Sequence, residues 1–239
     1  MNIRLKRYHK DFTYSYAYGV FSTIELLDTH PEHVLRVIIS SSGDGNSGIE
    51  KIKKLCKGHE IPVEVNDKTI ERISHMGKHL TVGVFSKYRS SMEPEKNHLV
   101  LVNPSDMGNI GTIARTMLGF GIVNLALIRP AVDYFDPRVI RASMGAVFHL
   151  NIQYFDDISD YCRSFKNDLY LLKTGSHCTI REVTFKKPYS LVFGNESSGL
   201  PDDLEIKGQA ITIPQNGRID SLNLSVAAGI ALYESSKIT

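Results

Sequence analysis

The sequence predicts an α/β protein in two parts, of which the larger is a mostly parallel sheet with helices on both faces. From residue 98 onward, short apolar runs rich in β-branched residues alternate with stretches of helical periodicity. Strands that alternate with helices at this spacing form a parallel sheet covered by its crossover helices. A polar stretch with a proline, residues 86–97, separates this run from a shorter α/β run before it. The chain therefore divides into a first domain at 1–90, a linker at 91–97 and a second domain at 98–239.

The second domain contains six predicted strands with helices between them. The strands are expected at 98–102, 122–128, 150–154, 169–172, 189–193 and 210–213. The helices are expected at about 108–118, 137–146, 157–165 and 221–236, with a short helix after residue 200. The loops after the last three strands should meet at the carboxyl edge of the sheet, where open α/β sheets bind ligands.

The first domain is a shorter α/β run that also contains a glycine-rich loop. Helices are expected at 19–28, from 49 and at 67–74, the last capped by Asp67, and strands at 34–39, 61–65 and 80–85. Gly43 to Gly48 matches the GxGxxG pattern of dinucleotide sites, with Glu64 at a plausible distance. Three serines separate the strand from the first glycine, whereas the fingerprint requires a tight turn at the strand end. A polar loop is favoured, and a nicotinamide-dependent oxidoreductase is kept as a rival.

Composition bounds the class of protein but does not select a function. Hydrophobic residues make up 42% of the 239 residues and charged residues 23%, which is typical of folded domains. The net charge of +2 permits a nucleic-acid partner without indicating one. The three cysteines are widely spaced, so neither a disulfide framework nor a zinc site is indicated. No apolar leader or membrane-length run is present, and a cytoplasmic location is expected.

The first eighteen residues combine basic and aromatic side chains. Arg4, Lys6 and Arg7 precede a series of tyrosines. Lysine and arginine neutralise phosphates, and bases stack on aromatic rings, so this segment suits RNA. An arm that packs its tyrosines on its own domain is the alternative, and the sequence leaves both open.

Three stretches of the second domain place small polar residues where a strand gives way to a helix. Residues 211–234 form a short apolar run, a polar turn and a helix for which Ser221 is the expected cap. Residues 191–201 form a strand that ends in a loop bounded by Gly194 and Gly199. Residues 99–121 form a strand, a loop and a helix that carries Asn109 and Arg115. Helix starts expose backbone N–H groups, which favour anionic or polar ligand atoms.

In this order, the three stretches resemble the three motifs of the SpoU (TrmH) family of RNA ribose methyltransferases, in the SPOUT superfamily. Asn109 and Arg115 resemble the first motif. The second motif is similar to Phe193-Gly194-Asn195-Glu196 with Gly199-Leu200. The third motif is similar to Ile213-Pro214 with Ser221-Leu222-Asn223. The resemblance implies a deep trefoil knot in the last third of the chain and an L30e-like, RNA-binding first domain. It also implies S-adenosyl-L-methionine as cofactor, a homodimer formed through the second domain and RNA as substrate.

The resemblance also implies roles for individual residues. The expected catalytic residues are Asn109, Arg115, Glu196, Ser221 and Asn223. The expected cofactor-binding residues are Thr174, Gly175, Phe193, Gly194, Asn195, Glu196, Ile213, Pro214, Ser221, Leu222 and Asn223. Arg138 and Arg141 lie three apart on one predicted helix and, with Arg4, Lys6 and Arg7, are expected to bind RNA. No cluster with metal-ligand spacing is evident, so no metal is expected.

Two questions stay open at the level of sequence. Arg115 is interpreted as a phosphate clamp, because an arginine with a pKa above about 12 is a poor base, although proton abstraction by it is the alternative. Ribosomal RNA is the expected substrate, with transfer RNA as the alternative. A catalytically silent RNA-binding module of the same fold is a third interpretation. Gln215 stands where methionine is common in the family, which bears on the donor pocket.

Overall fold

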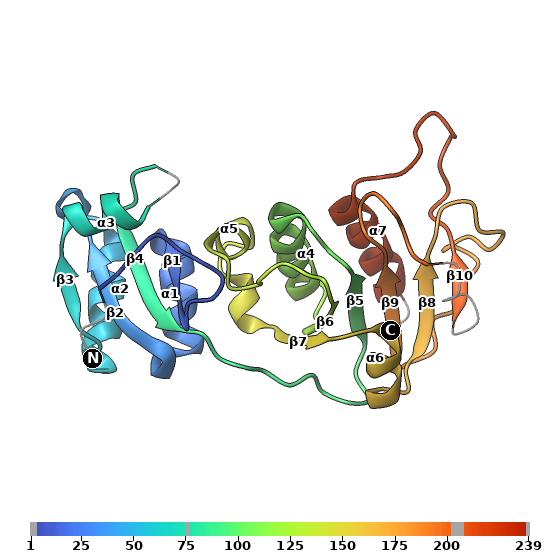
Figure 1. Cartoon of the computed structure of the whole chain (residues 1–239), viewed down its shortest axis with the longest axis horizontal. Helices are drawn as coiled ribbons and strands as arrows, with labels where there is room; N and C mark the ends of the chain where they lie inside the picture. The colour runs from blue at the N-terminus through green and yellow to red at the C-terminus, as the bar shows by residue number, and fades with distance from the viewer. Residues whose placement is uncertain (1–3, 75–76, 202–207, 238–239) are drawn as a thin grey trace. The chain divides into compact units, whose positions relative to one another are not determined.

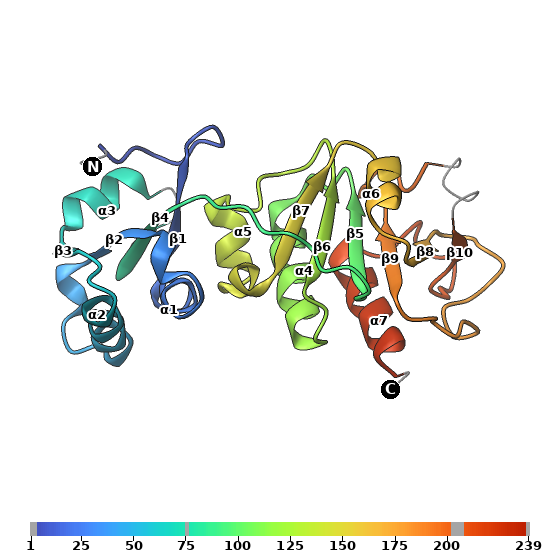
Figure 2. The same ribbon diagram turned by 90° about the horizontal axis from the view of Figure 1, so that it is seen from below.

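The computed structural model describes residues 4–74, 77–201 and 208–237. The chain forms two units, and the first is discontinuous: it comprises residues 1–88 and 133–149, whereas the second comprises 89–132 and 150–239. The short helix expected after residue 200 falls largely outside the described residues. Figures 1 and 2 show the elements of each unit.

The first unit is a small mixed sheet with helices. Its strands are β1 (Tyr14–Tyr18), β2 (Val34–Ile39), β3 (Val63–Val65) and β4 (Thr81–Ser86), in the order β1-β4-β2-β3. Strand β4 is antiparallel to both β1 and β2, and β3 is parallel to β2. The helices are α1 (Val20–Thr29), α2 (Ser47–Gly58), α3 (Asp67–Ile73) and α5 (Pro137–Ala142), with 3₁₀ turns at Pro31–His33, Ser41–Gly43 and Ala146–His149.

Three tyrosines near the N-terminus lie in strand β1, which decides between the two interpretations of this segment. Tyr14, Tyr16 and Tyr18 are all buried, in a core cluster with Ile38, Val82 and other apolar side chains. Their rings contact one another at 5.7 Å between centroids, so they are not available to stack on bases. Arg4, Lys6 and Arg7 in front of the strand are exposed. The packing alternative therefore holds for these tyrosines, while the cations keep their access to a ligand.

Residues 133–149 fold with the first unit, although they lie in the middle of the range assigned to the second domain. Asp133 accepts a hydrogen bond from Lys87 Nζ at 2.6 Å. The rings of Phe135 and Phe148 each lie 5.4 Å from that of Phe85, edge-on. Gly145 lies so close to α1 that a Cβ added there would be 2.7 Å from the Cβ of Glu25. The predicted helix 137–146 is shorter than expected and ends at Ala142, in the first unit.

Hydrogen bonds to polar side chains fix the conformation of the glycine-rich loop. Ser40 Oγ and Ser41 Oγ each donate to the Asp67 carboxylate at 2.6 Å. Asn46 caps α2, accepting from the backbone N–H groups of Gly48 and Ile49. A Cβ on Gly48 would lie 2.4 Å from a Val20 side-chain carbon, so this glycine permits close packing of α2 against α1. Helix α3 is capped by Asn66 and not by Asp67 as expected, because Asp67 is occupied by the two serines.

The second unit is a six-stranded, all-parallel sheet in the order β10-β8-β9-β5-β6-β7. The strands are β5 (His98–Val102), β6 (Asn124–Ile128), β7 (Asn151–Phe155), β8 (Asp168–Leu172), β9 (Tyr189–Phe193) and β10 (Gln209–Ile211). The helices are α4 (Met107–Gly119), α6 (Ile158–Ser164) and α7 (Leu224–Ser236). In Figure 2, α4 and α7 lie on one face of the sheet and α6 on the other. The predicted α/β class and parallel sheet are confirmed.

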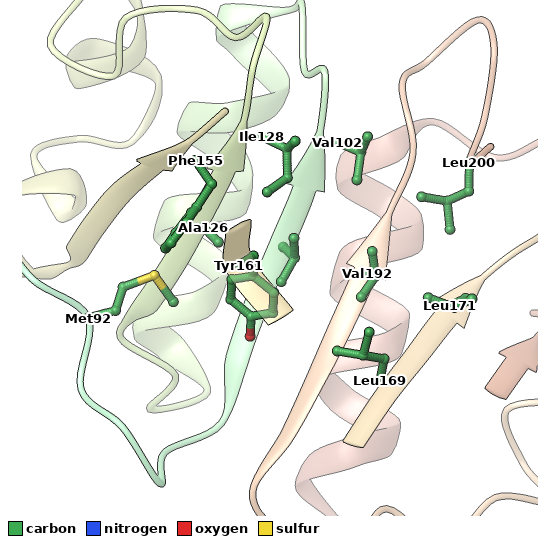
Figure 3. Close-up of a cluster of buried hydrophobic side chains, with 11 residues drawn as sticks. Met92, Val102, Ala126, Ile128, Phe155, Tyr161, Leu169, Leu171, Val192 and Leu200 are labelled. Atoms are coloured by element: carbon green, nitrogen blue, oxygen red, sulfur yellow. The ribbon is translucent and has the colours of Figure 1, made fainter. Parts of the chain in front are cut away.

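The core of the second unit forms where the apolar strands β5, β6 and β9 meet the helices. On the face of α6, Tyr161 is fully buried among side chains that include Val100, Val102, Ile128 and Val192 (Figure 3). All five residues of β5 and of β9 are buried, as expected for central strands of a parallel sheet. No helix of the described residues could cross a membrane.

Candidate active site

The three polar stretches singled out in the sequence meet at the carboxyl edge of the parallel sheet. They line a cavity of about 830 Å³, which lies within the usual range of about 300–1,000 Å³ for ligand pockets. The end of β8 contributes Leu172, and the loop after it contributes Lys173 and Thr174. The remaining lining residues come from the end of β9, from the loops after β5, β9 and β10, and from the starts of α4 and α7: Ser105, Asp106, Asn109, Phe193, Gly194, Asn195, Glu196, Ser197, Ser198, Gly199, Thr212, Ile213, Gln215, Asp220, Ser221, Leu222, Asn223, Leu224 and Ala227.

One chain of hydrogen bonds joins the three stretches through Asn109. The Asn109 side-chain amide donates to Glu196 Oε1 at 3.3 Å. Its carbonyl oxygen accepts from Asn223 Nδ2 at 3.0 Å. Asn223 in turn caps α7 by accepting from the backbone N–H of Ser225 at 2.9 Å. A donor and an acceptor are both needed at position 109, which an asparagine supplies and an aspartate does not.

Glu196 ties its loop to the start of α4. Its carboxylate accepts from Ser105 Oγ at 2.9 Å and from the backbone N–H of Asp106 at 3.3 Å, in addition to Asn109. Partial burial alone would raise the pKa of Glu196, but the hydrogen bonds from backbone and side chains outweigh it, so the pKa lies below its ordinary value. The carboxylate is therefore charged at neutral pH and acts as an acceptor only.

The loop after β9 is a tight hairpin closed by Asn195. The backbones of Asn195 and Gly199 exchange two hydrogen bonds at 3.2 and 3.0 Å, and the Asn195 side chain donates to the carbonyl of Asn103 at 2.7 Å. A Cβ on Gly194 would lie 2.1 Å from the backbone of Gly199. Gly199 has a φ of +68°, in the left-handed region that glycine adopts readily. The loop thus needs glycine at these two positions for different reasons.

The residues present fit S-adenosylmethionine. Adenine and ribose have polar edges that loop amides and carbonyls can satisfy, with apolar side chains such as Phe193, Ile213 and Leu222 at their faces. The Gly194–Gly199 hairpin borders the cavity, and its two strands approach so closely that no Cβ fits at Gly194. Carboxylates at the cavity, among them Glu196, suit a sulfonium cation.

The helix caps at the cavity are Asn223 and Asp106, and the first of them differs from the expected Ser221. The sequence predicts Ser221 as the cap of a helix that starts at residue 221, but α7 begins at Leu224 and Asn223 caps it. Ser221 instead lines the cavity, three residues before the helix. At α4, Asp106 is the cap, accepting from the backbone N–H of Asn109 at 2.7 Å. This leaves the Asn109 side chain available for Glu196 and Asn223.

Several residues that line the cavity were not predicted from the sequence. Ser105, Asp106, Lys173 and Asp220 were not among the candidates. Asp106 stands two residues before the predicted helix start at about 108, and as a residue type that favours the cap position it could have been found from the sequence. Lys173 directly follows an expected strand, and the carboxyl-edge rule would have found it.

Some predicted residues lie away from the cavity. Arg115 is exposed on α4 and is not among the lining residues, and neither are Gly175 and Pro214. Six residues of helix separate Arg115 from Asn109, a rise of about 9 Å. Arg138 and Arg141 are exposed in the first unit, the same unit as the basic residues near the N-terminus.

Comparison with known proteins agrees with this geometry. The model of the SpoU rRNA Methylase family matches residues 96–233. The structure of an AdoMet-bound rRNA methyltransferase from Sinorhizobium meliloti superposes with a TM-score of 0.80, is 27% identical and is matched over 94% of this chain and 87% of that one. Fold and site together define an RNA 2′-O-methyltransferase that uses S-adenosylmethionine. The chain belongs to the SpoU family.

Three curated relatives differ in how much of the chain they match. An uncharacterized tRNA/rRNA methyltransferase from Synechocystis is 31% identical over 73% of this chain and 65% of its own length. The 23S rRNA (guanosine-2′-O-)-methyltransferase of Acinetobacter baylyi is 25% identical over 93% of this chain and 96% of its own. A putative tRNA (cytidine(34)-2′-O)-methyltransferase from Listeria monocytogenes is 34% identical over 58% of this chain and 86% of its own.

Proposed function

We propose that the protein methylates a ribose 2′-hydroxyl in ribosomal RNA. The observation that supports this substrate is the extent of the matches. The Acinetobacter rRNA enzyme and the Sinorhizobium rRNA enzyme match over nearly the whole chain, first unit included. The putative tRNA relative matches only 58% of this chain although 86% of its own length is covered, so a large part of this chain has no counterpart in it. A first unit that binds ribosomal RNA would account for the presence of two units in this chain.

Some residues of the site bind the cofactor, and others bind the RNA. S-adenosylmethionine supplies an electrophilic methyl group on a sulfonium. The hairpin at Gly194 and the loops at Thr174 and Ile213 hold the adenosine. Asn109 donates to Glu196 and accepts from Asn223, and these two bonds fix the hairpin and the start of α7. Fixed loops align the reacting atoms before the reaction, which lowers its entropic cost. Arg115 binds the phosphate beside the target ribose and positions its 2′-hydroxyl.

The test of the substrate is a map of 2′-O-methyl groups in ribosomal and transfer RNA from cells with and without the gene. We expect one ribosomal position to lose its methyl group, and the purified protein to restore it with S-adenosylmethionine. Loss of a transfer-RNA methyl group alone would favour the alternative substrate. Unchanged maps of both RNAs would favour the catalytically silent module.

The predicted RNA-binding cations all belong to the first unit, which makes a charge-matched test possible. Arg138 donates from Nε and an Nη to the buried Asp136 at 2.9 and 2.7 Å, so its guanidinium is oriented, yet its side chain is 56% exposed. We expect Arg138→Gln with Arg141→Gln to weaken RNA binding and to lower the slope of its salt dependence by about 0.7–0.9 for each phosphate that is no longer neutralised. Filter binding over a salt series measures both.

The control removes two cations from another surface of the same unit. Lys54 and Lys57 are exposed on α2, and Lys54→Gln with Lys57→Gln changes the net charge equally. We expect this control to keep most of the affinity. An equal loss of RNA affinity in both double variants would mean that the net charge determines binding and that the location of the two arginines on α5 does not.

We also propose a homodimer formed through the second unit. Ile219, Val226 and Tyr233 are 55%, 50% and 52% exposed and line a groove of about 780 Å³ along α7. Exposed apolar side chains gathered in one groove are a mark of an interface. We expect wild type to be dimeric at micromolar concentration by light scattering, and Val226→Asp to be monomeric. Val65→Asp, at a 65% exposed valine of the first unit, should stay dimeric, and a monomeric wild type would refute the proposal.

A further inference from the structure

A 3₁₀ turn of the first unit gathers two histidines and a glutamate. His30 precedes the turn Pro31–His33, and Glu32 lies within it. His30 Nδ1 lies 3.3 Å, and His33 Nε2 3.6 Å, from Glu32 Oε1. These three potential ligand atoms all lie within 4.8 Å of one another. Two ligand atoms at about 2.1 Å from a tetrahedral zinc ion lie about 3.4 Å apart, so the spacing to Glu32 matches a shared metal.

The hydrogen bond at the far side of the His30 ring determines which nitrogen faces the cluster as an acceptor. His30 Nε2 lies 2.9 Å from the backbone carbonyl oxygen of Phe148. A carbonyl oxygen only accepts, so Nε2 carries the hydrogen, and in a neutral ring Nδ1 carries the lone pair. That lone pair faces the Glu32 carboxylate. Two acceptors at this distance need a cation, which is either a second proton on His30 or a metal ion.

The two rings are held in place by aromatic contacts. The Tyr88 ring stacks on that of His33 at 4.6 Å and 12°, and lies 4.3 Å from that of His30. His33 Nδ1 lies 3.4 Å from Ser86 Oγ, which leaves Nε2 turned toward Glu32. Imidazoles whose other nitrogen is engaged by a polar partner are typical of metal ligands. The histidine side chains are half-buried, while Glu32 is 60% exposed and gives an ion access.

We propose that His30 Nδ1, His33 Nε2 and the Glu32 carboxylate bind a divalent transition metal, with zinc as the best match. Imidazole nitrogen and carboxylate oxygen are common zinc ligands, and three protein ligands leave a fourth position for water. The bound ion stabilises the turn beside Tyr88. Tyr88 is the last residue of the first unit before the chain enters the second. All three ligands belong to the first unit, whereas the residues that line the cavity belong to the second. This spacing was not recognised in the sequence.

The test measures zinc binding by the full-length, metal-free protein and three variants. Calorimetry with zinc chloride should give one equivalent bound by the wild type, and cobalt should give the visible absorption of a low-coordinate site. His30→Gln and Glu32→Gln should each weaken binding by at least about 10-fold. Glu32 is exposed, so its variant is expected to fold. His59→Gln, at an exposed histidine outside the cluster, should bind as the wild type does.

A second readout is the melting temperature. A metal that binds only the folded state raises the melting temperature to an extent set by its affinity, so zinc should raise that of the wild type and of His59→Gln but not those of the ligand variants. If the wild type binds no zinc, the proposal is wrong. Equal binding by wild type and the ligand variants would also overturn it.

Discussion

Replacing Arg115 with alanine should abolish methyl transfer and leave the affinity for the cofactor nearly unchanged. Arg115 is exposed on α4 and does not line the cavity, so the substitution leaves the cofactor site intact. A charge-assisted contact to the RNA that strengthens in the transition state affects the rate more than ground-state binding. Removal of one preorganised electrostatic group costs about 100-fold or more in rate. Calorimetry with S-adenosylhomocysteine and single-turnover methylation measure the two quantities separately.

Two further variants separate a catalytic from a structural role of Arg115. Arg115→Lys should rescue little, because an ammonium is a point charge and cannot replace a planar fork of donors. Arg163→Ala removes an exposed arginine of α6 and should leave both quantities unchanged. A structural role predicts a lower melting temperature together with weaker cofactor binding. If Arg115→Ala stays within a few-fold of the wild-type rate, the catalytic assignment fails.

The position of Arg115 also bears on the proposed dimer. The cavity is bordered by the start of α4 at Asn109, and Arg115 lies nearly two turns further along the helix. In a single chain its guanidinium is therefore displaced from the cavity. Arg115 can contribute to the reaction only if the RNA or a second copy of the chain brings the methyl acceptor toward it. A rate that falls with dissociation of the dimer would connect the two proposals.

The parallel sheet was predictable because its strands carry a strong local signal. Central strands of a parallel sheet are buried on both faces, and runs such as Leu99–Val102 and Leu191–Phe193 therefore stand out as uninterrupted apolar stretches. The loops that follow them were predictable for the same reason, since parallel strands place their carboxyl ends together. The meeting of Asn109, Glu196 and Asn223 follows from that topology.

The features that could not be predicted from the sequence depend on contacts between distant segments. Strand β1 begins at Tyr14, and its burial depends on pairing with β4, about seventy residues later. Nothing local to residues 133–149 shows that Phe135 and Phe148 pack on Phe85. This packing also determines which form of the protein suits a test of cofactor binding. A protein that starts near His98 would expose these two phenylalanines, so cofactor-binding tests are better made on the full-length chain.

Replacing Gly194 with alanine should remove cofactor binding without unfolding the protein. Its Cβ would lie 2.1 Å from the backbone carbonyl carbon of Gly199, a clash that side-chain rotation cannot relieve. The hairpin must therefore open, and displacement of the Asn195–Glu196 segment also breaks the bonds to Asn103 and Asn109. A misplacement of about 1 Å in a preorganised site costs about 100-fold in rate. We expect single-turnover methylation to slow by at least that factor, and calorimetry with S-adenosylhomocysteine to show that binding is lost.

Two other glycine positions show whether the clash at Gly194 is the cause. At Gly199 the added Cβ meets nothing within 4 Å, but the φ of +68° is unfavourable for alanine by about 1–2 kcal/mol. Gly199→Ala should therefore weaken binding less than Gly194→Ala, and Gly199→Asn less still, because asparagine tolerates this conformation. Gly119→Ala, at the end of α4 with open space around it, should bind as the wild type does. If Gly194→Ala binds the cofactor as tightly as Gly119→Ala, the hairpin after β9 is not part of the cofactor site.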